Sequence, residues 1–132
     1  MVCKPETNLT RNETLVFDVL QKAEGPMSAY TILDELREDG FRAPLQVYRA
    51  VEKLREKGVV HRLESLNAFV ACKHPDCKTH ETPVFMICDT CKQVEEISAT
   101  RLFSVLERLA ERNDFQAKNS AIELRGECGS CQ

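Results

Sequence analysis

The sequence predicts an α+β protein in two parts, and three observations support this fold class. Residues 10–58 contain three segments with apolar residues at helical spacing and recognisable start or stop signals. Residues 59–72 form two β-rich runs around a turn-like "ESLN", which predicts a hairpin. The second half combines short β-rich runs with one amphipathic helix and contains two Cys-x-x-Cys pairs.

The first two helices have clear start signals. Thr10 and Glu13 have the spacing of a capping box, and Ser28 is a favourable N-cap for the second helix, which Gly40 should end. The predicted buried stripes are Leu15, Val16, Val19 and Leu20 in the first helix, and Ala29, Ile32, Leu33 and Leu36 in the second.

The third helix begins near Pro44 and stops at Gly58. Its buried stripe should consist of Val47, Val51 and Leu54, and the hairpin after it should direct Val60 and Phe69 inward. Three helices followed by a hairpin are typical of a winged helix, which places the last helix of its helix-turn-helix in the DNA major groove. We therefore predict a winged-helix DNA-binding domain over residues 1–71.

Charge on the third helix agrees with DNA as a partner. The chain as a whole has a formal net charge of -3, which gives no support to nucleic-acid binding. Between residues 42 and 62, however, six cations face two anions (Glu52 and Glu56), a local charge of +4. The cations are Arg42, Arg49, Lys53, Arg55, Lys57 and Arg62. A few phosphate contacts suffice for a half-site, although a solvated amphipathic helix is the alternative interpretation.

The second half predicts a small α/β unit. Strands are expected at 84–88 and 92–97, then a helix over 99–113 with Leu102, Val105, Leu106 and Leu109 on one face, then a strand at 119–126. A unit of this size buries little apolar surface, so zinc and dimerisation are the expected stabilisers. A twofold homodimer would present two recognition helices to a palindromic operator. We assign residues 84–132 to this dimerisation domain and residues 72–83 to a hinge that carries metal ligands.

The cysteines predict a structural zinc site in this domain. Cys88 with Cys91 and Cys128 with Cys131 are two pairs that can complete a tetrahedral shell of four thiolates, and Gly129 should permit the tight turn. The intervening residues 92–127 are too many for a compact zinc ribbon, so folded structure must lie between the pairs. The alternative is that one pair is a redox dithiol, but the strand-then-helix context of such motifs is absent.

Other features narrow the class of protein. The N-terminus lacks an apolar stretch of signal-peptide length, and no window approaches a membrane span, so we expect a cytoplasmic protein with no membrane partner. No nucleophile, base and orienting group form a recognisable set. We therefore predict a protein that is not an enzyme and has no small-molecule substrate.

Three stretches carry a resemblance to a known family. "PLQVYRAVEKLREKGVVHRLESLNAFVAC", then "FMICDTC", then the C-terminal "CGSC" resemble the ferric uptake regulator family of bacterial metal-dependent repressors, and most of all its zinc uptake regulators. The resemblance covers nearly the whole chain from about Thr10. It implies a winged-helix domain joined to a dimerisation domain, and a structural zinc held by the two Cys-x-x-Cys pairs.

The resemblance also implies a second, regulatory zinc site, which would give two zinc ions per protomer. His61, Cys72, His80 and Glu96 match its ligand positions. One thiolate, two imidazoles and a carboxylate suit zinc, and an ion bound to all four would fix the angle between the domains and so favour operator binding. Taken singly, each residue has an ordinary structural explanation. His74 and Cys77 in "ACKHPDCKTH" receive no role.

Departures from the family pattern affect the choice of metal and the base contacts. Iron-sensing members carry a histidine-rich run where this chain has "KTHETPVFMIC" with a single histidine, and a thiolate-containing site favours zinc over iron. A sensor of iron or of another metal remains the alternative to a zinc sensor. The resemblance places Tyr30, Gln46, Tyr48 and Arg49 at the DNA, with Gln46 standing where a threonine is common. We predict that Arg49 reads a guanine and that the two tyrosines contact the DNA backbone or thymine methyl groups, with a place in the core as the alternative for Tyr48.

Overall fold

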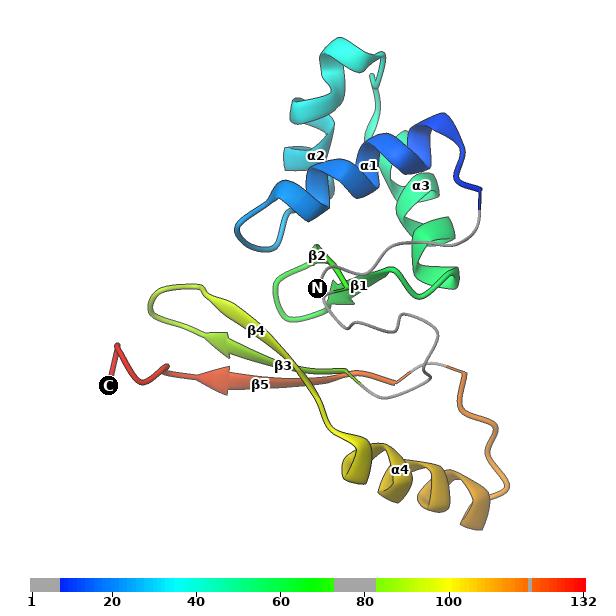
Figure 1. Cartoon of the computed structure of the whole chain (residues 1–132), viewed down its shortest axis with the longest axis vertical. Coiled ribbons are helices and arrows are strands. Elements are labelled where there is room, and N and C mark those ends of the chain that lie inside the picture. Colours follow the sequence, from blue (N-terminus) through cyan, green and yellow to red (C-terminus); the bar gives the residue numbers. More distant parts are fainter. Residues whose placement is uncertain (1–7, 73–82, 119) are drawn as a thin grey trace. The chain divides into compact units, whose positions relative to one another are not determined.

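A computed structural model of the chain describes residues 8–118 except 73–82, together with residues 120–132. The chain divides into two compact units, Met1–Lys78 and Thr79–Gln132 (Figure 1). The division falls inside the segment 72–83 that the sequence predicts as a hinge. Most of that segment lies outside the described residues, so the domain limits stay a prediction.

The first unit begins with three helices. These are α1 (Arg11–Lys22), α2 (Ala29–Leu36, followed by a short 3-10 turn at Arg37–Asp39) and α3 (Pro44–Glu56). The predicted caps are confirmed: the hydroxyl of Thr10 accepts from the Glu13 N–H at 3.2 Å, and that of Ser28 accepts from the Thr31 N–H at 3.2 Å. Gly40 and Gly58 end the second and third helices with φ of 99° and 77°, values that favour glycine.

One core joins these helices to the hairpin of β1 (Val60–Leu63) and β2 (Ala68–Ala71). In Figure 1, α1 crosses α2 and α3, and it packs against both. Met27 forms a bridge with Phe69, exchanging backbone hydrogen bonds of 3.0 and 2.8 Å, and so ties the start of α2 to the hairpin. The core contains the predicted residues Val16, Leu20, Ala29, Ile32, Leu33, Leu36, Val47, Val51, Leu54, Val60 and Phe69. Three helices with a hairpin confirm the winged helix.

The second unit is a three-stranded sheet with one helix. Its strands are β3 (Pro83–Cys88), β4 (Val94–Ser98) and β5 (Ile122–Gly126), in the order β4-β3-β5. β3 pairs with β4 in the antiparallel sense and with β5 in the parallel sense. The parallel pairing requires a crossover, which contains α4 (Thr100–Arg112). This confirms the prediction that folded structure lies between the two cysteine pairs.

Helix α4 differs from the helices of the first unit because none of its residues is buried. Val105 is 58% exposed and Leu109 is 56% exposed, and Phe115 beyond the helix is 67% exposed. The amphipathic pattern therefore predicts the helix correctly, but the described residues of the second unit cover its apolar face only in part. None of the described helices is long and apolar enough to cross a membrane.

Candidate metal centre and nucleic-acid interface

Four cysteines gather at one end of the three-stranded sheet. Cys88 is the last residue of β3 and Cys91 lies in the turn that follows. Cys128 and Cys131 follow β5, whose Gly126 is in register with Cys88 across the parallel pair. Because parallel neighbouring strands end on the same side, both Cys-x-x-Cys turns leave the sheet together.

The four thiols are close enough to share one ion. Their sulfur atoms all lie within 4.8 Å of one another, and those of Cys91 and Cys128 are 3.8 Å apart. The two turns are also tied together by backbone, since the N–H of Asp89 donates to the carbonyl of Gly126 at 2.8 Å. The structure thus brings together all four residues that the spacing predicts.

Two details of the turns differ from what the sequence predicts. Gly129 is not required where the sequence suggests it, because it has no positive φ and a Cβ there would meet no atom within 4 Å. The left-handed residue is instead Lys92, with φ of 65°, and its N–H donates to the carbonyl of Cys88 at 2.9 Å. Beside the turns, Arg125 pairs with the carboxylate of Asp89 at 3.0 Å.

The electrostatics of the four thiols favour a bound cation. The backbone N–H groups of Cys91 and Cys128 point at the sulfur of Cys88 from 3.5 and 3.4 Å, and they lower the pKa of Cys88 to about 6. Hydrogen bonds to the Cys128 and Cys88 sulfurs and partial burial raise the pKa of Cys131 to about 12. The N–H of Gln93 lowers the pKa of Cys91, but its sulfur neighbours and burial outweigh this and raise that pKa overall.

Four sulfurs this close cannot all be thiolates without a counter-charge, and a divalent cation supplies one. Zinc accepts four cysteine thiolates in tetrahedral structural sites, so the donor set fits zinc. A redox dithiol needs only one Cys-x-x-Cys pair, so it would not explain why the second pair lies beside the first. The clustering of both pairs therefore favours the structural metal site over the redox alternative.

The predicted regulatory ligands lie on different elements. In the first unit, His61 is on β1 and Cys72 follows β2, and a ring nitrogen of His61 lies within 4.8 Å of the Cys72 sulfur. Cys72 is 3% exposed, and its N–H donates to the carbonyl of Val59 at 2.8 Å. Glu96 is on β4 of the second unit. His80, together with His74 and Cys77, lies outside the described residues.

The predicted DNA contacts lie on α2 and α3. Arg49 is exposed, Tyr30 is 65% exposed and Tyr48 is 39% exposed, with its ring edge-on to Phe69 at a centroid distance of 6.3 Å. Gln46 has a structural task that its residue type does not reveal. Its side-chain carbonyl accepts from the backbone N–H groups of Arg42 at 2.6 Å and Ala43 at 3.0 Å, and thereby caps α3.

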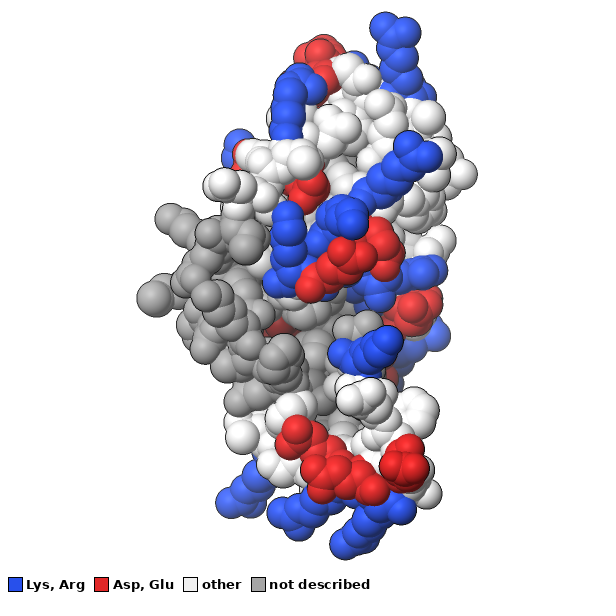
Figure 2. Space-filling model, turned by 90° about the vertical axis from the view of Figure 1, so that its right-hand side faces the viewer, with Lys and Arg blue, Asp and Glu red and all other residues white. Residues whose placement is uncertain are grey.

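The basic character of α3 is weaker in the structure than in the sequence. Four of the six cations face carboxylates: Lys53 with Glu56 at 3.6 Å, Arg55 with Glu52 at 3.3 Å, Lys57 with Glu13 at 2.8 Å, and Arg62 with Glu64 at 3.7 Å. Figure 2 shows Lys and Arg side chains interspersed with Asp and Glu on the face that it draws. Within the part of the chain that the structure describes, Arg42 and Arg49 have no carboxylate partner.

One exposed residue of α3 was missed by the sequence reasoning. Leu45 lies in the first turn of α3 and is 55% exposed. The first turn of a recognition helix is the part that reaches base edges, and apolar side chains contact the methyl group of thymine. The sequence could have indicated the exposure of Leu45, because this residue lies outside the buried stripe of Val47, Val51 and Leu54.

Comparison with known proteins decides the family. Residues 4–125 match the model of the Ferric uptake regulator family. This chain belongs to that family. The zinc uptake regulation protein of Escherichia coli (strain K12) is 38% identical to this chain over 124 residues, which cover 93% of this chain and 72% of that protein. A ferric uptake regulation protein from Neisseria gonorrhoeae is 24% identical over 121 residues, covering 89% and 81%.

Solved structures agree with this assignment. A zinc uptake regulator complexed with zinc and DNA has a TM-score of 0.84 at 36% identity, covering 95% of this chain and 83% of that one. The crystal structure of holo XcZur has a TM-score of 0.82 at 38% identity, covering 96% and 87%. Membership of a family of regulators confirms the prediction that the chain is not an enzyme, and the matches confirm the α+β fold class.

Proposed function

We propose that this protein is a zinc-responsive transcriptional repressor that binds a palindromic DNA operator as a homodimer and works in the cytoplasm. The observation that carries the proposal is the similarity, along nearly the whole chain, to a zinc uptake regulator complexed with zinc and DNA. The winged helix supplies the DNA-binding element, with α3 as the recognition helix. The exposed apolar face of α4 supports a second copy as the partner of the second unit.

Zinc would have two separate tasks, with two ions per protomer. Cys88, Cys91, Cys128 and Cys131 would hold one ion permanently and stabilise the second unit. His61, Cys72, His80 and Glu96 would hold the second, regulatory ion. The nearness of the His61 ring to the Cys72 sulfur within the first unit supports the second set, because it places two suitable donors side by side.

The regulatory ion would act by selecting one conformation. An ion that binds donors from both units stabilises only the arrangement in which all donors reach it, so its binding energy becomes a bias toward that arrangement. The operator would then bind the zinc-loaded dimer more tightly than the zinc-poor dimer. Arg49, Tyr30, Gln46 and Tyr48 are the proposed contacts to DNA.

The test combines zinc stoichiometry with DNA binding. Native mass spectrometry over a series of buffered free-zinc concentrations should show two ions per protomer, of which one leaves reversibly while the dimer survives. Cys72→Ser should lose the labile ion and zinc-dependent DNA binding, but keep the tightly held ion. One tightly held ion at every zinc concentration, with unchanged DNA binding in Cys72→Ser, would contradict the regulatory site. DNA binding that responds to ferrous iron instead of zinc would favour the iron-sensing alternative.

A further inference from the structure

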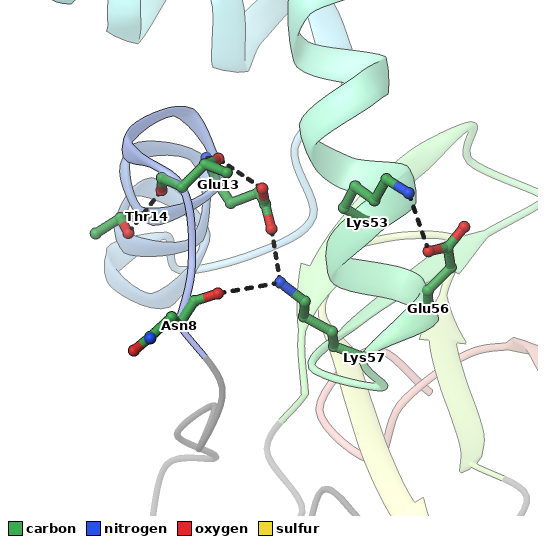
Figure 3. A network of polar contacts seen from close by, with 7 residues as sticks. Asn8, Glu13, Thr14, Lys53, Glu56 and Lys57 are labelled. Carbon is green, nitrogen blue, oxygen red and sulfur yellow. Dashed lines mark hydrogen bonds and ion pairs between the residues drawn. The ribbon is translucent and has the colours of Figure 1, made fainter.

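An ion pair joins the end of the recognition helix to the beginning of α1. The Nζ atom of Lys57, the residue that follows α3, lies 2.8 Å from a carboxylate oxygen of Glu13 in the first turn of α1. Figure 3 shows the ammonium group between this carboxylate and the backbone carbonyl of Asn8, to which it donates at 3.5 Å. The two residues are 44 positions apart in sequence, so the pair connects two helices.

The Glu13 end of this pair is buried. Glu13 is 6% exposed, and no other charged or polar residue of the described ranges is buried. The hydroxyl of Thr10 also donates to its carboxylate, at 2.5 Å. The hydrogen bond from Lys57 is the largest influence that lowers the pKa of Glu13, followed by the one from Thr10. A buried carboxylate without a cationic partner is costly, so Glu13 constrains where Lys57 can lie.

The other ion pairs of α3 are of a different kind. Lys53 pairs with Glu56 and Arg55 with Glu52, each three residues away on the same helix, and all but Arg55 are at least 60% exposed. Pairs of this type contribute little to stability and do not connect α3 to another element. They therefore provide matched controls for the Lys57–Glu13 pair within the same helix.

We propose that Glu13 and Lys57 are positioning residues of the DNA-binding face: their ion pair holds the C-terminal end of α3 against α1, and Lys57 does not neutralise a DNA phosphate. The inference rests on the proposed function in that DNA affinity is its readout. It reverses the assignment suggested by charge counting, in which Lys57 is one of six cations available to phosphate.

The two roles predict opposite effects for Glu13. If Lys57 contacts phosphate, Lys57→Met should weaken DNA binding and reduce the slope of log K against log salt by about 1.8, because both protomers of the dimer lose a contact, whereas Glu13→Gln removes a competing anion and should not weaken binding. If the pair positions α3, both substitutions should weaken binding about five- to tenfold, with the salt slope unchanged. The double variant should then bind no worse than either single variant.

The experiment uses the full-length zinc-loaded protein and the double-stranded DNA that the wild type selects from a random-sequence pool. Dissociation constants are measured over a salt series for Lys57→Met, Glu13→Gln, the double variant, Lys57→Arg and the control Glu56→Gln. Lys57→Arg keeps the cation and should bind DNA much more tightly than Lys57→Met. Glu56→Gln should not weaken DNA binding. Reduced salt slope in Lys57→Met, or wild-type affinity in folded Glu13→Gln, would overturn the proposal.

Hydrogen exchange separates failure of this inference from failure of the proposed function. In the absence of DNA, both single variants should exchange faster at the N–H groups of Lys57, Gly58 and Val59, which donate to α3 carbonyls, while Glu56→Gln should not. If the wild-type protein selects no DNA, the proposed repressor function is contradicted, but the faster exchange in the two variants would still support the positioning of α3 by the ion pair. Unchanged exchange in both single variants would overturn the positioning role, whatever the DNA result.

Discussion

The two units of this protein are stabilised in different ways. The first packs three helices and a hairpin around a single core that includes fully buried Ile32, Val47 and Leu54. In the second, the buried apolar residues among those described all lie on one strand: Val84, Phe85, Ile87 and Cys88 of β3. No residue of its helix α4 is fully buried, and Val105 and Leu109 remain exposed. The first unit can therefore depend on its own core, whereas the second requires a metal ion and a partner surface.

This difference matches the division of tasks in the proposed repressor. A DNA-binding domain benefits from a rigid fold that keeps its recognition helix in place. A unit that depends on zinc and on a second copy instead links folding to metal and to assembly. In such a design, losing the structural ion would dissociate the pair of recognition helices without unfolding either one.

The largest expected effect comes from removing one structural ligand. Cys88→Ser should abolish tight zinc binding at the four-cysteine site and unfold the second unit, because its few buried residues cannot replace the metal. Hydrogen exchange should show lost protection in β3, β4 and β5 and retained protection in α1 to α3. The measurement is exchange by mass spectrometry together with zinc content.

The converse substitution tests the first unit. Leu54 is fully buried, so Leu54→Ala should cost about 2–5 kcal/mol of that unit's unfolding free energy. Zinc content at the four cysteines should not change. Simultaneous loss of protection in both units in either variant would show that they fold as one cooperative body and are not stabilised separately.

A smaller effect is expected from pH. The pKa values of Cys91 and Cys131 are raised, the latter to about 12, so both are neutral thiols at pH 7 in the metal-free protein. Zinc binds thiolates, and its binding must therefore release at least these two protons. Zinc affinity should fall by at least about 100-fold for each unit of decreasing pH near neutrality.

The slope should become steeper at acid pH. Cys88, with a pKa of about 6, is mostly a thiolate at pH 7 and contributes a further proton only below that value. Competition with a chelator of known proton linkage, measured between pH 5.5 and 8, checks this slope. Zinc affinity that does not change with pH would contradict the assigned protonation states. The stability of the first unit over the same range provides the reference.

The sequence predicted the features that depend on local spacing. Helix caps at Thr10 and Ser28 and most of the buried stripes of the three helices follow from short-range patterns. The gathering of the four cysteines joins distant segments, and it was predicted because two Cys-x-x-Cys pairs together make a complete ligand set for zinc. Contacts between distant residues that leave no such motif were not predicted. Charge counting could not show that Lys57 pairs with Glu13, and the family resemblance suggested a DNA contact for Gln46 without showing that its carbonyl caps α3.

The smallest expected effect concerns how the helices of the two units begin. In the first unit, Thr10 and Ser28 cap α1 and α2, whereas Ala99 precedes α4 in the second unit with no side-chain cap. Ala99→Ser supplies an acceptor for the orphan N–H groups and should stabilise the second unit by about 0.5–1 kcal/mol. Thr10→Ala should destabilise the first unit by about 1 kcal/mol.

Hydrogen exchange measured during chemical denaturation gives the unfolding free energy of each unit, and so measures both changes. Ala99 has an extended φ of -133° and a ψ of 83°, so the backbone before α4 must shift toward the β region for the new hydroxyl to reach the helix. If Ala99→Ser leaves the second unit unchanged while Thr10→Ala has its full effect, zinc and the partner surface fix the start of α4 so firmly that a local cap adds nothing. A gain in stability would instead mean that part of the second unit's weakness is local, and that its dependence on zinc can be reduced without altering the metal site.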